Sequence, residues 1–138
     1  MRIKKHPYGC SLIITLFSAF GNLNKELWVN PNSGSAMSAG NISLSDNIQD
    51  FRMLRVSFKI DYNNSYYTNA LISVVNGYTQ PIKVTSLNVE GTLLFQRGIG
   101  TSTGKSLAIE GGYYTAALNG AMANYGGALV PVRVWGIK

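Results

Sequence analysis

The chain has 138 residues, of which 46% are hydrophobic and only 13% are charged. This length is enough for one domain with a core of its own. Because about a quarter of the residues in a typical soluble domain are charged, Ser, Thr, Asn, Gly and Tyr must cover much of this surface. Such a surface favours polar recognition, or tight packing between subunits, over charge-driven chemistry.

The net charge of +6 is concentrated at the start of the sequence, where Arg2, Lys4 and Lys5 supply half of it. Farther along, Arg55 and Lys59 alternate with apolar residues, which is typical of the solvated face of a strand. A phosphate-binding surface needs more basic groups gathered on one side. The charge pattern therefore favours a solvated strand face over a phosphate-binding stripe, and we expect no nucleic-acid partner.

Residues 1–25 are predicted to form a segment separate from the β-rich domain at 26–138. An apolar run at 10–20 follows the basic residues. The run is too short for a transmembrane helix, which needs about 20 residues, so no membrane span is expected, but it has the length of a signal-peptide core. Cleavage after Gly21 is one interpretation. The alternatives are a helix that docks on the domain or on a neighbouring subunit, and a start codon assigned upstream of the true one.

From residue 26 onward, short β-rich runs are separated by turn residues, which predicts an all-β, antiparallel β-sandwich or jelly-roll-like fold. Asn76-Gly77 is a strong hairpin signal, whereas Gly98, Gly100 and Gly104 predict a flexible connection. About eight strands are expected within residues 26–30, 41–44, 51–60, 66–75, 82–89, 92–97, 107–110, 113–118 and 129–137.

Few residues in the domain could carry out catalysis. The only histidine is His6, in the N-terminal segment, so a Ser-His-Asp or Cys-His site within the domain is excluded for want of a base. The single cysteine, Cys10, excludes an intramolecular disulfide and a Cys-based zinc site. The loop at 61–65 offers oxygen ligands but few carboxylates, so a polar turn is preferred to a calcium site. We expect a protein that is not an enzyme and has no metal and no cofactor. The acidic residues are Glu26, Asp46, Asp50, Asp61, Glu90 and Glu110.

Tyrosine and asparagine are interleaved in two parts of the chain, 61–67 and 119–127. A tyrosine ring offers a flat apolar face with a polar tip, and an asparagine amide both donates and accepts hydrogen bonds, so loops rich in both can bind sugars. For any single tyrosine, strand packing is the alternative explanation. The candidate receptor-binding or glycan-binding residues are Tyr62, Asn63, Asn64, Tyr66, Tyr67, Asn119, Asn124 and Tyr125.

Three phrases of the sequence carry a resemblance to a known family: Glu26-Leu27-Trp28-Val29-Asn30, the segment 41–51, and the closing segment 129–138 with its Trp135-Gly136-Ile137-Lys138 ending. Together they resemble the C-terminal β-sandwich modules of bacteriophage tail fibre and baseplate proteins. The resemblance covers residues 26–138 and includes no catalytic signature. Trp28 and Trp135 fall on its framework phrases, so they are expected to be packing anchors.

The resemblance implies a module in the tail of a virion that attaches to a bacterial surface receptor, a polysaccharide, and that binds other tail proteins. Modules of this kind are usually homotrimers, and a trimer would also cover exposed strand edges. The resemblance also favours the interpretations of residues 1–25 that involve no signal peptide, because tail proteins are normally not exported by one. Two alternatives stay open. One is a structural assembly module of the virion without a receptor site, and the other is a secreted bacterial carbohydrate-binding or adhesion protein.

Overall fold

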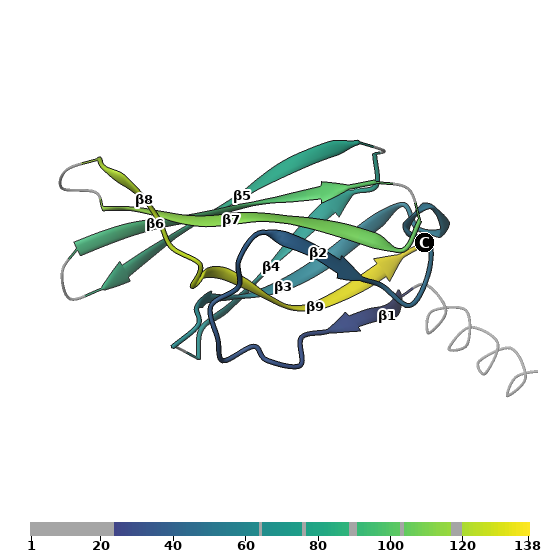
Figure 1. Ribbon diagram of the computed structural model, residues 1–138, viewed down its shortest axis with the longest axis horizontal. Coiled ribbons are helices and arrows are strands. Elements are labelled where there is room, and N and C mark those ends of the chain that lie inside the picture. The colour runs from purple at the N-terminus through teal and green to yellow at the C-terminus, as the bar shows by residue number, and fades with distance from the viewer. Residues whose placement is uncertain (1–23, 64, 76, 89–90, 103, 117–119) are drawn as a thin grey trace, which may run out of the picture.

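The computed structural model describes residues 24–63, 65–75, 77–88, 91–102, 104–116 and 120–138. They form two antiparallel sheets, so the predicted β-sandwich is confirmed (Figure 1). The segment predicted at 1–25 lies outside the described residues except for Asn24 and Lys25, which begin the first strand. Among the described residues, no helix has the length and apolar character that crossing a membrane requires.

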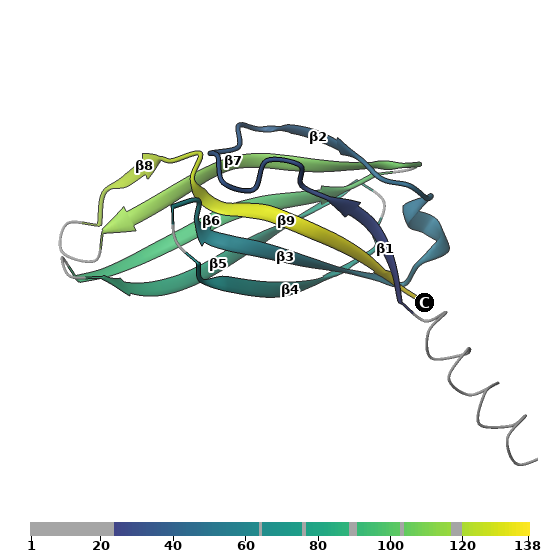
Figure 2. The same ribbon diagram turned by 90° about the horizontal axis from the view of Figure 1, so that it is seen from below.

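The sandwich consists of a four-stranded and a five-stranded sheet (Figure 2). The four-stranded sheet has the order β1 (Asn24–Val29), β9 (Ala128–Ile137), β3 (Met53–Asp61) and β4 (Tyr67–Ser73). The other has the order β2 (Gly40–Ser43), β7 (Ser106–Ala116), β6 (Gly91–Thr101) and β5 (Tyr78–Asn88), with β8 (Met122–Asn124) also paired to β7. A short 3₁₀ helix, η1 (Ile48–Asp50), lies between β2 and β3.

Several strand boundaries differ from those predicted. β7 is one strand where two were expected at 107–110 and 113–118, and β8 was not predicted. Gly98 and Gly100 lie inside β6, so the prediction of a flexible connection there is wrong. The hairpin predicted at Asn76-Gly77 is also wrong, because β4 and β5 belong to different sheets. Gly77, with φ of 72°, lies in the link that carries the chain from one sheet to the other.

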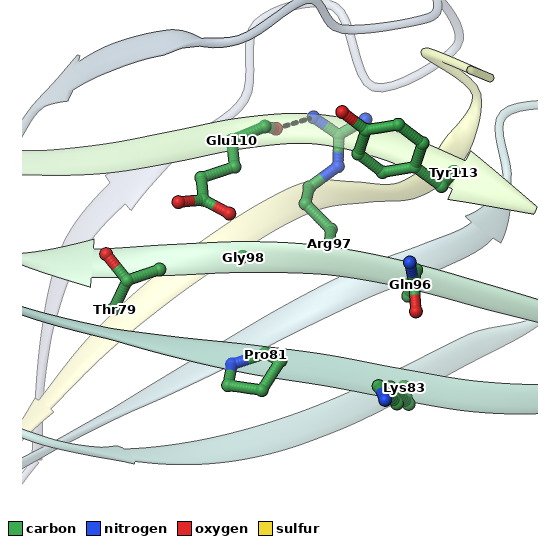
Figure 3. A pocket seen from close by; sticks show the side chains of 8 residues that line it. All are labelled: Thr79, Pro81, Lys83, Gln96, Arg97, Gly98, Glu110 and Tyr113. Atoms are coloured by element: carbon green, nitrogen blue, oxygen red, sulfur yellow. Dashed lines mark hydrogen bonds between the residues drawn. The ribbon is translucent and has the colours of Figure 1, made fainter. Parts of the chain in front are cut away.

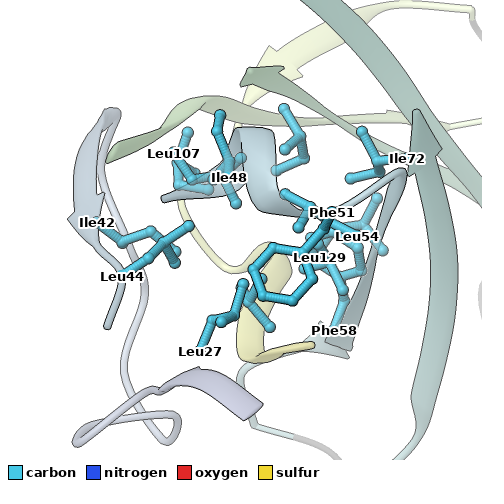
Figure 4. Close-up of a cluster of buried hydrophobic side chains, with 14 of the residues drawn as sticks. Leu27, Ile42, Leu44, Ile48, Phe51, Leu54, Phe58, Ile72, Leu107 and Leu129 are labelled. Atoms are coloured by element: carbon cyan, nitrogen blue, oxygen red, sulfur yellow. The ribbon is translucent and has the colours of Figure 1, made fainter. Parts of the chain in front are cut away.

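The core forms where the inner faces of the two sheets meet (Figure 4). In β3, Leu54, Val56 and Phe58 are fully buried, whereas Arg55 between them is exposed. This is the period-two alternation that the sequence predicted. Burial of each such aliphatic side chain stabilises the fold by about 1.5 to 3 kcal/mol. Ile99 and Leu107, from β6 and β7, are buried opposite them.

β9 holds the four-stranded sheet together, because it pairs with β1 on one side and with β3 on the other. Val130 and Val134 are fully buried, but Val132 is half-buried because a bulge opposite Ser57 and Phe58 shifts the register. The prediction that Val130, Val132 and Val134 are all buried on one face of β9 is therefore wrong for Val132. Leu129 has φ of 48°, a conformation that costs about 1–2 kcal/mol in an L residue, and its complete burial offsets that cost.

Arg97 of β6 is the only charged side chain among the buried residues that the structure describes, with 1% of its surface exposed. All its hydrogen bonds go to backbone carbonyls. Nε donates to Ala128 O at 2.9 Å, Nη1 to Glu110 O at 2.8 Å, and Nη2 to Gly126 O at 2.9 Å and Met37 O at 3.1 Å. Burial lowers the pKa of Arg97 to about 10, so the guanidinium remains charged at neutral pH and ties four segments together.

The edges of the two sheets are joined at one point by a side chain. The Gln80 carboxamide of β5 donates to Ser73 O of β4 at 2.8 Å and accepts from Ser73 N at 3.4 Å. Pro81, the next residue, lies in an edge strand, where a missing N–H is tolerated. Both features reduce the capacity of these edges to pair with another chain.

We expect Arg97→Met to lower the free energy of unfolding by several kcal/mol, because each buried carbonyl group that is left unsatisfied costs about 1–3 kcal/mol. Methionine fills part of the volume but removes every hydrogen bond that Arg97 donates to the four carbonyl groups, although Gly126 O still accepts from Met37 N. Guanidinium chloride unfolding, followed by tryptophan fluorescence, measures the change. Arg133→Met is the matched control, because Arg133 forms only an exposed ion pair with Glu26 at 3.4 Å, which contributes about 0–1 kcal/mol. Equal losses in both variants would contradict the structural role given to Arg97.

Truncation before Leu129 removes nearly all of β9 and should leave an insoluble or unfolded protein, since β1 and β3 would lose their shared partner. Deletion of residues 1–21 removes no strand that the structure describes, and the domain should still fold. Circular dichroism in the far ultraviolet distinguishes the two proteins. A folded C-terminal truncation together with an unfolded N-terminal one would show that this architecture is wrong.

Candidate functional site

A hollow of about 300 Å³ lies on the outer face of the five-stranded sheet (Figure 3). Strands β5, β6 and β7 line it. Apart from Arg97, whose side chain is buried, its lining residues on β5 and β6 alternate with residues that point away from this face, as the period of a strand requires. They are Thr79, Pro81, Lys83, Gln96, Arg97, Gly98, Glu110 and Tyr113.

Strand register aligns one row of polar and aromatic side chains across this face. Lys83 pairs with Gln96, Gln96 with Tyr113, and Tyr113 with Asn124, so the row crosses β5, β6, β7 and β8. Directly paired residues share a face of the sheet. We call these four residues the polar row. It presents a cation, one amide and a tyrosine ring along one edge of the pocket, and a second amide, that of Asn124, beyond it.

Gly98 forms the floor of the pocket. A Cβ atom at this position would overlap the carboxylate of Glu110. The carboxylate can therefore lie here only because residue 98 has no side chain. The register between β6 and β7 also shifts between Arg97 and Ile99. Such a bulge redirects side chains locally, and here Glu110 extends over the glycine (Figure 3).

The Glu110 carboxylate is exposed and, within the described part of the chain, has no hydrogen-bond or ion-pair partner. Its backbone is held firmly, because Glu110 O accepts the hydrogen bond from Arg97 Nη1. A free carboxylate on a fixed backbone can accept hydrogen bonds from the hydroxyl groups of a ligand. Lys83 and Gln96 can donate to ligand oxygen atoms in the same pocket.

The lining residues contain a single carboxylate. Hydrolysis of a glycosidic bond usually takes two, facing each other across the bond. Among the described residues, no group of three or more His, Cys, Asp or Glu side chains could hold a metal ion. The polar groups that line the pocket are suited to hydrogen bonding with a polar ligand.

Two candidates from the sequence, Tyr62 and Tyr125, meet at the end of the sandwich where β3 ends and β9 begins. Their ring centroids lie 6.3 Å apart, and Tyr125 also contacts Tyr114 and Phe95 at 5.7 and 6.5 Å. The Tyr125 hydroxyl donates to Asp61 Oδ1 at 3.0 Å. The two segments 61–67 and 119–127 are thus joined here, but Tyr125 is half-buried and packs against the core.

The other candidates of the 61–67 segment are spread over different surfaces. The backbone N–H of Asn63 donates to Asp61 Oδ1 at 3.0 Å, which forms a local turn. Tyr66 is exposed, and Tyr67 is exposed on the outer face of the four-stranded sheet. Asn64 lies outside the described residues.

In the 119–127 segment, Asn124 is exposed and lies in the polar row beside the pocket, whereas Asn119 lies outside the described residues. The sequence did not single out Glu110, Gln96, Lys83 or Gly98 as site residues. The signal for Gly98 was present, because a glycine within a run of β-forming residues indicates a bulge or a close approach.

No protein-family model matches this sequence, and no curated protein matches it either. Function is therefore inferred from the geometry of the pocket and from the resemblance carried by the three sequence phrases.

Burial, followed by the hydrogen bond to Asp61, raises the pKa of Tyr125 to about 12. Because an unfolded tyrosine titrates near 10, the stabilisation from Tyr125 should be complete below pH 10 and lost as the pH rises through 12. When tyrosine absorbance is followed in an alkaline titration, Tyr125 should deprotonate in a late step near pH 12. The substitution Tyr125→Phe should remove this step. Tyr67→Phe, at an exposed ring, is the control and should leave the late step in place. A late step that persists in Tyr125→Phe would refute the assignment.

Proposed function

We propose that this chain is a non-catalytic glycan-binding module of the receptor-binding type found in bacteriophage tail fibres. The observation that carries the proposal is the pocket over Gly98, where a carboxylate, an amide, an ammonium group and a tyrosine ring converge on one outer sheet face. Sugars present hydroxyl groups and flat apolar ring faces, and these side chains complement both. The low charge of the surface agrees with such a ligand.

The proposal places the module in the tail of a virion, attached to other tail proteins, as the resemblance implies. In that setting the receptor is a polysaccharide of the bacterial surface and the module acts as a homotrimer. Repetition of the pocket in three copies would raise the apparent affinity without any new contact, because each further site binds at a high effective concentration. A shallow, polar pocket with weak affinity for one sugar would then suffice for attachment.

Glu110→Gln and Gly98→Ala test the pocket in binding to an array of bacterial surface glycans. Loss of a hydrogen bond to a charged group costs about 1.5–3 kcal/mol, so Glu110→Gln should weaken binding about 10- to 100-fold. Gly98→Ala should weaken it similarly, because its methyl group displaces the Glu110 carboxylate. Dissociation constants for any glycan retained by the intact protein give the measurement.

Asp50→Asn is the control variant, since Asp50 is an exposed carboxylate that does not line the pocket. It should bind like the unmodified protein, and circular dichroism should be unchanged in all three variants. Binding that survives both pocket substitutions would place the glycan site elsewhere. Failure of the intact protein to bind any cell-envelope glycan would refute the proposal itself.

A further inference from the structure

The outer face of the four-stranded sheet carries a second set of side chains with a shared chemistry, distinct from the pocket. On β3, Arg55 and Lys59 both point outward, and neither forms an ion pair with a described residue. Arg133 of β9 is on the same face, where it pairs with Glu26 at 3.4 Å. These three cations, two of which have no ion-pair partner among the described residues, make this a basic face.

Aromatic rings hold the two unpaired cations in place. The Arg55 guanidinium lies 5.3 Å from the ring centroid of Trp135, and Lys59 Nζ lies 5.9 Å from that of Tyr67. Strand pairing places each cation beside its ring, because Arg55 pairs with Trp135 and Lys59 with Tyr67. Cation–π contacts at exposed sites contribute about 0.5–1 kcal/mol each and restrict the two side chains, which reduces the entropy lost on binding.

We propose that this face binds an acidic polysaccharide, with Arg55 and Lys59 as the groups that contact its carboxylates. Four residues along a strand separate the two positions by about 13 Å, a distance that a single sugar ring does not bridge, so the ligand is a polymer. The inference rests on the proposed function in one respect, that the ligand is a glycan. The surface that binds it is separate from the pocket.

Charge and composition argue against other occupants of this face. A second copy of the chain would bring two basic faces together, and like charges repel across an interface. The middle of the face holds Ser57 and Asn69, hydrogen-bonded to each other, between the two cations. Leu71, which pairs with Arg55, is the exposed apolar side chain beside them, but the centre of a protein interface is more apolar than this and is depleted in Lys and Ser. Proteins that bind single-stranded nucleic acid stack bases on aromatic rings, and here the protein's own Arg55 and Lys59 already lie over the two rings.

The experiment compares binding of the full chain to polygalacturonate, to neutral dextran and to a single-stranded oligothymidylate. The protein should bind polygalacturonate, more weakly as salt is raised, and should not bind dextran on this face. The double variant Arg55→Gln with Lys59→Gln should bind polygalacturonate at least about 10-fold more weakly, with a shallower salt dependence. The variant loses two cation–π contacts at the surface, which contribute about 0.5–1 kcal/mol each, so its free energy of unfolding should fall by no more than about 1–2 kcal/mol and it should remain folded.

Arg52→Gln with Lys138→Gln is the matched control, because it removes the same charge, one arginine and one lysine, from two exposed residues that do not line the pocket over Gly98. It should retain polygalacturonate binding. If this control loses as much binding as the Arg55 and Lys59 variant, net charge is responsible, and the inference is overturned. Absence of polygalacturonate binding by the intact protein, or tighter binding of the oligonucleotide, also overturns it.

An experiment that refutes polygalacturonate binding by Arg55 and Lys59 can be distinguished from one that refutes glycan binding in the pocket. Glu110→Gln and Gly98→Ala alter the pocket and leave Arg55 and Lys59 untouched, so they should not change polygalacturonate binding. The two sets of variants therefore report on separate surfaces of the same protein.

Discussion

The burial of one guanidinium group, that of Arg97, is the interaction on which the rest of this sandwich depends. A charge in the interior is tolerated only when its donors are satisfied, and here carbonyl groups from four segments satisfy them. Only arginine has a planar fork with enough donors to reach them all. Gly112 leaves the necessary room, since a Cβ atom there would lie 2.5 Å from Arg97 Nη2. The guanidinium thus fixes the start of β9 and, through Glu110 O, the backbone beside the pocket.

Local patterns in the sequence were sufficient for the fold class but not for the connections. Alternation in β3 and in the second half of β9 predicted their buried faces, because a half-buried strand must repeat every two residues. Asn76-Gly77 has the composition of a hairpin turn, yet it links two sheets. Turn residues indicate that the chain changes direction, but they do not indicate which strands pair afterwards. The bulges near Gly98 and Val132 could not be placed, since they depend on register with strands far away in the sequence.

The candidate site was harder to predict from the sequence than the fold. Tyr62 and Tyr125 were chosen for their residue type, and they do meet, but the meeting is an aromatic cluster packed against the core. The pocket depends on pairing of Lys83 with Gln96 and of Gln96 with Tyr113, three residues far apart in sequence and unremarkable one by one. Asn124 was a candidate and lies beside the pocket, because β8 pairs with β7. The sequence therefore indicated types of side chain, whereas strand register decided which side chains lie together at the pocket.

The position of β9 between β1 and β3 has a consequence for how the protein is made. Residues 24–29 and 53–61 leave the ribosome long before residues 128–137, yet neither strand can complete its hydrogen bonding until the later segment arrives. Contacts so distant in sequence form slowly because the chain entropy must be lost first. During synthesis, β3 can pair only with β4, and its other edge stays open to strands of neighbouring chains. Slow translation, or crowding of nascent chains on one messenger, should therefore favour misassembly of this protein.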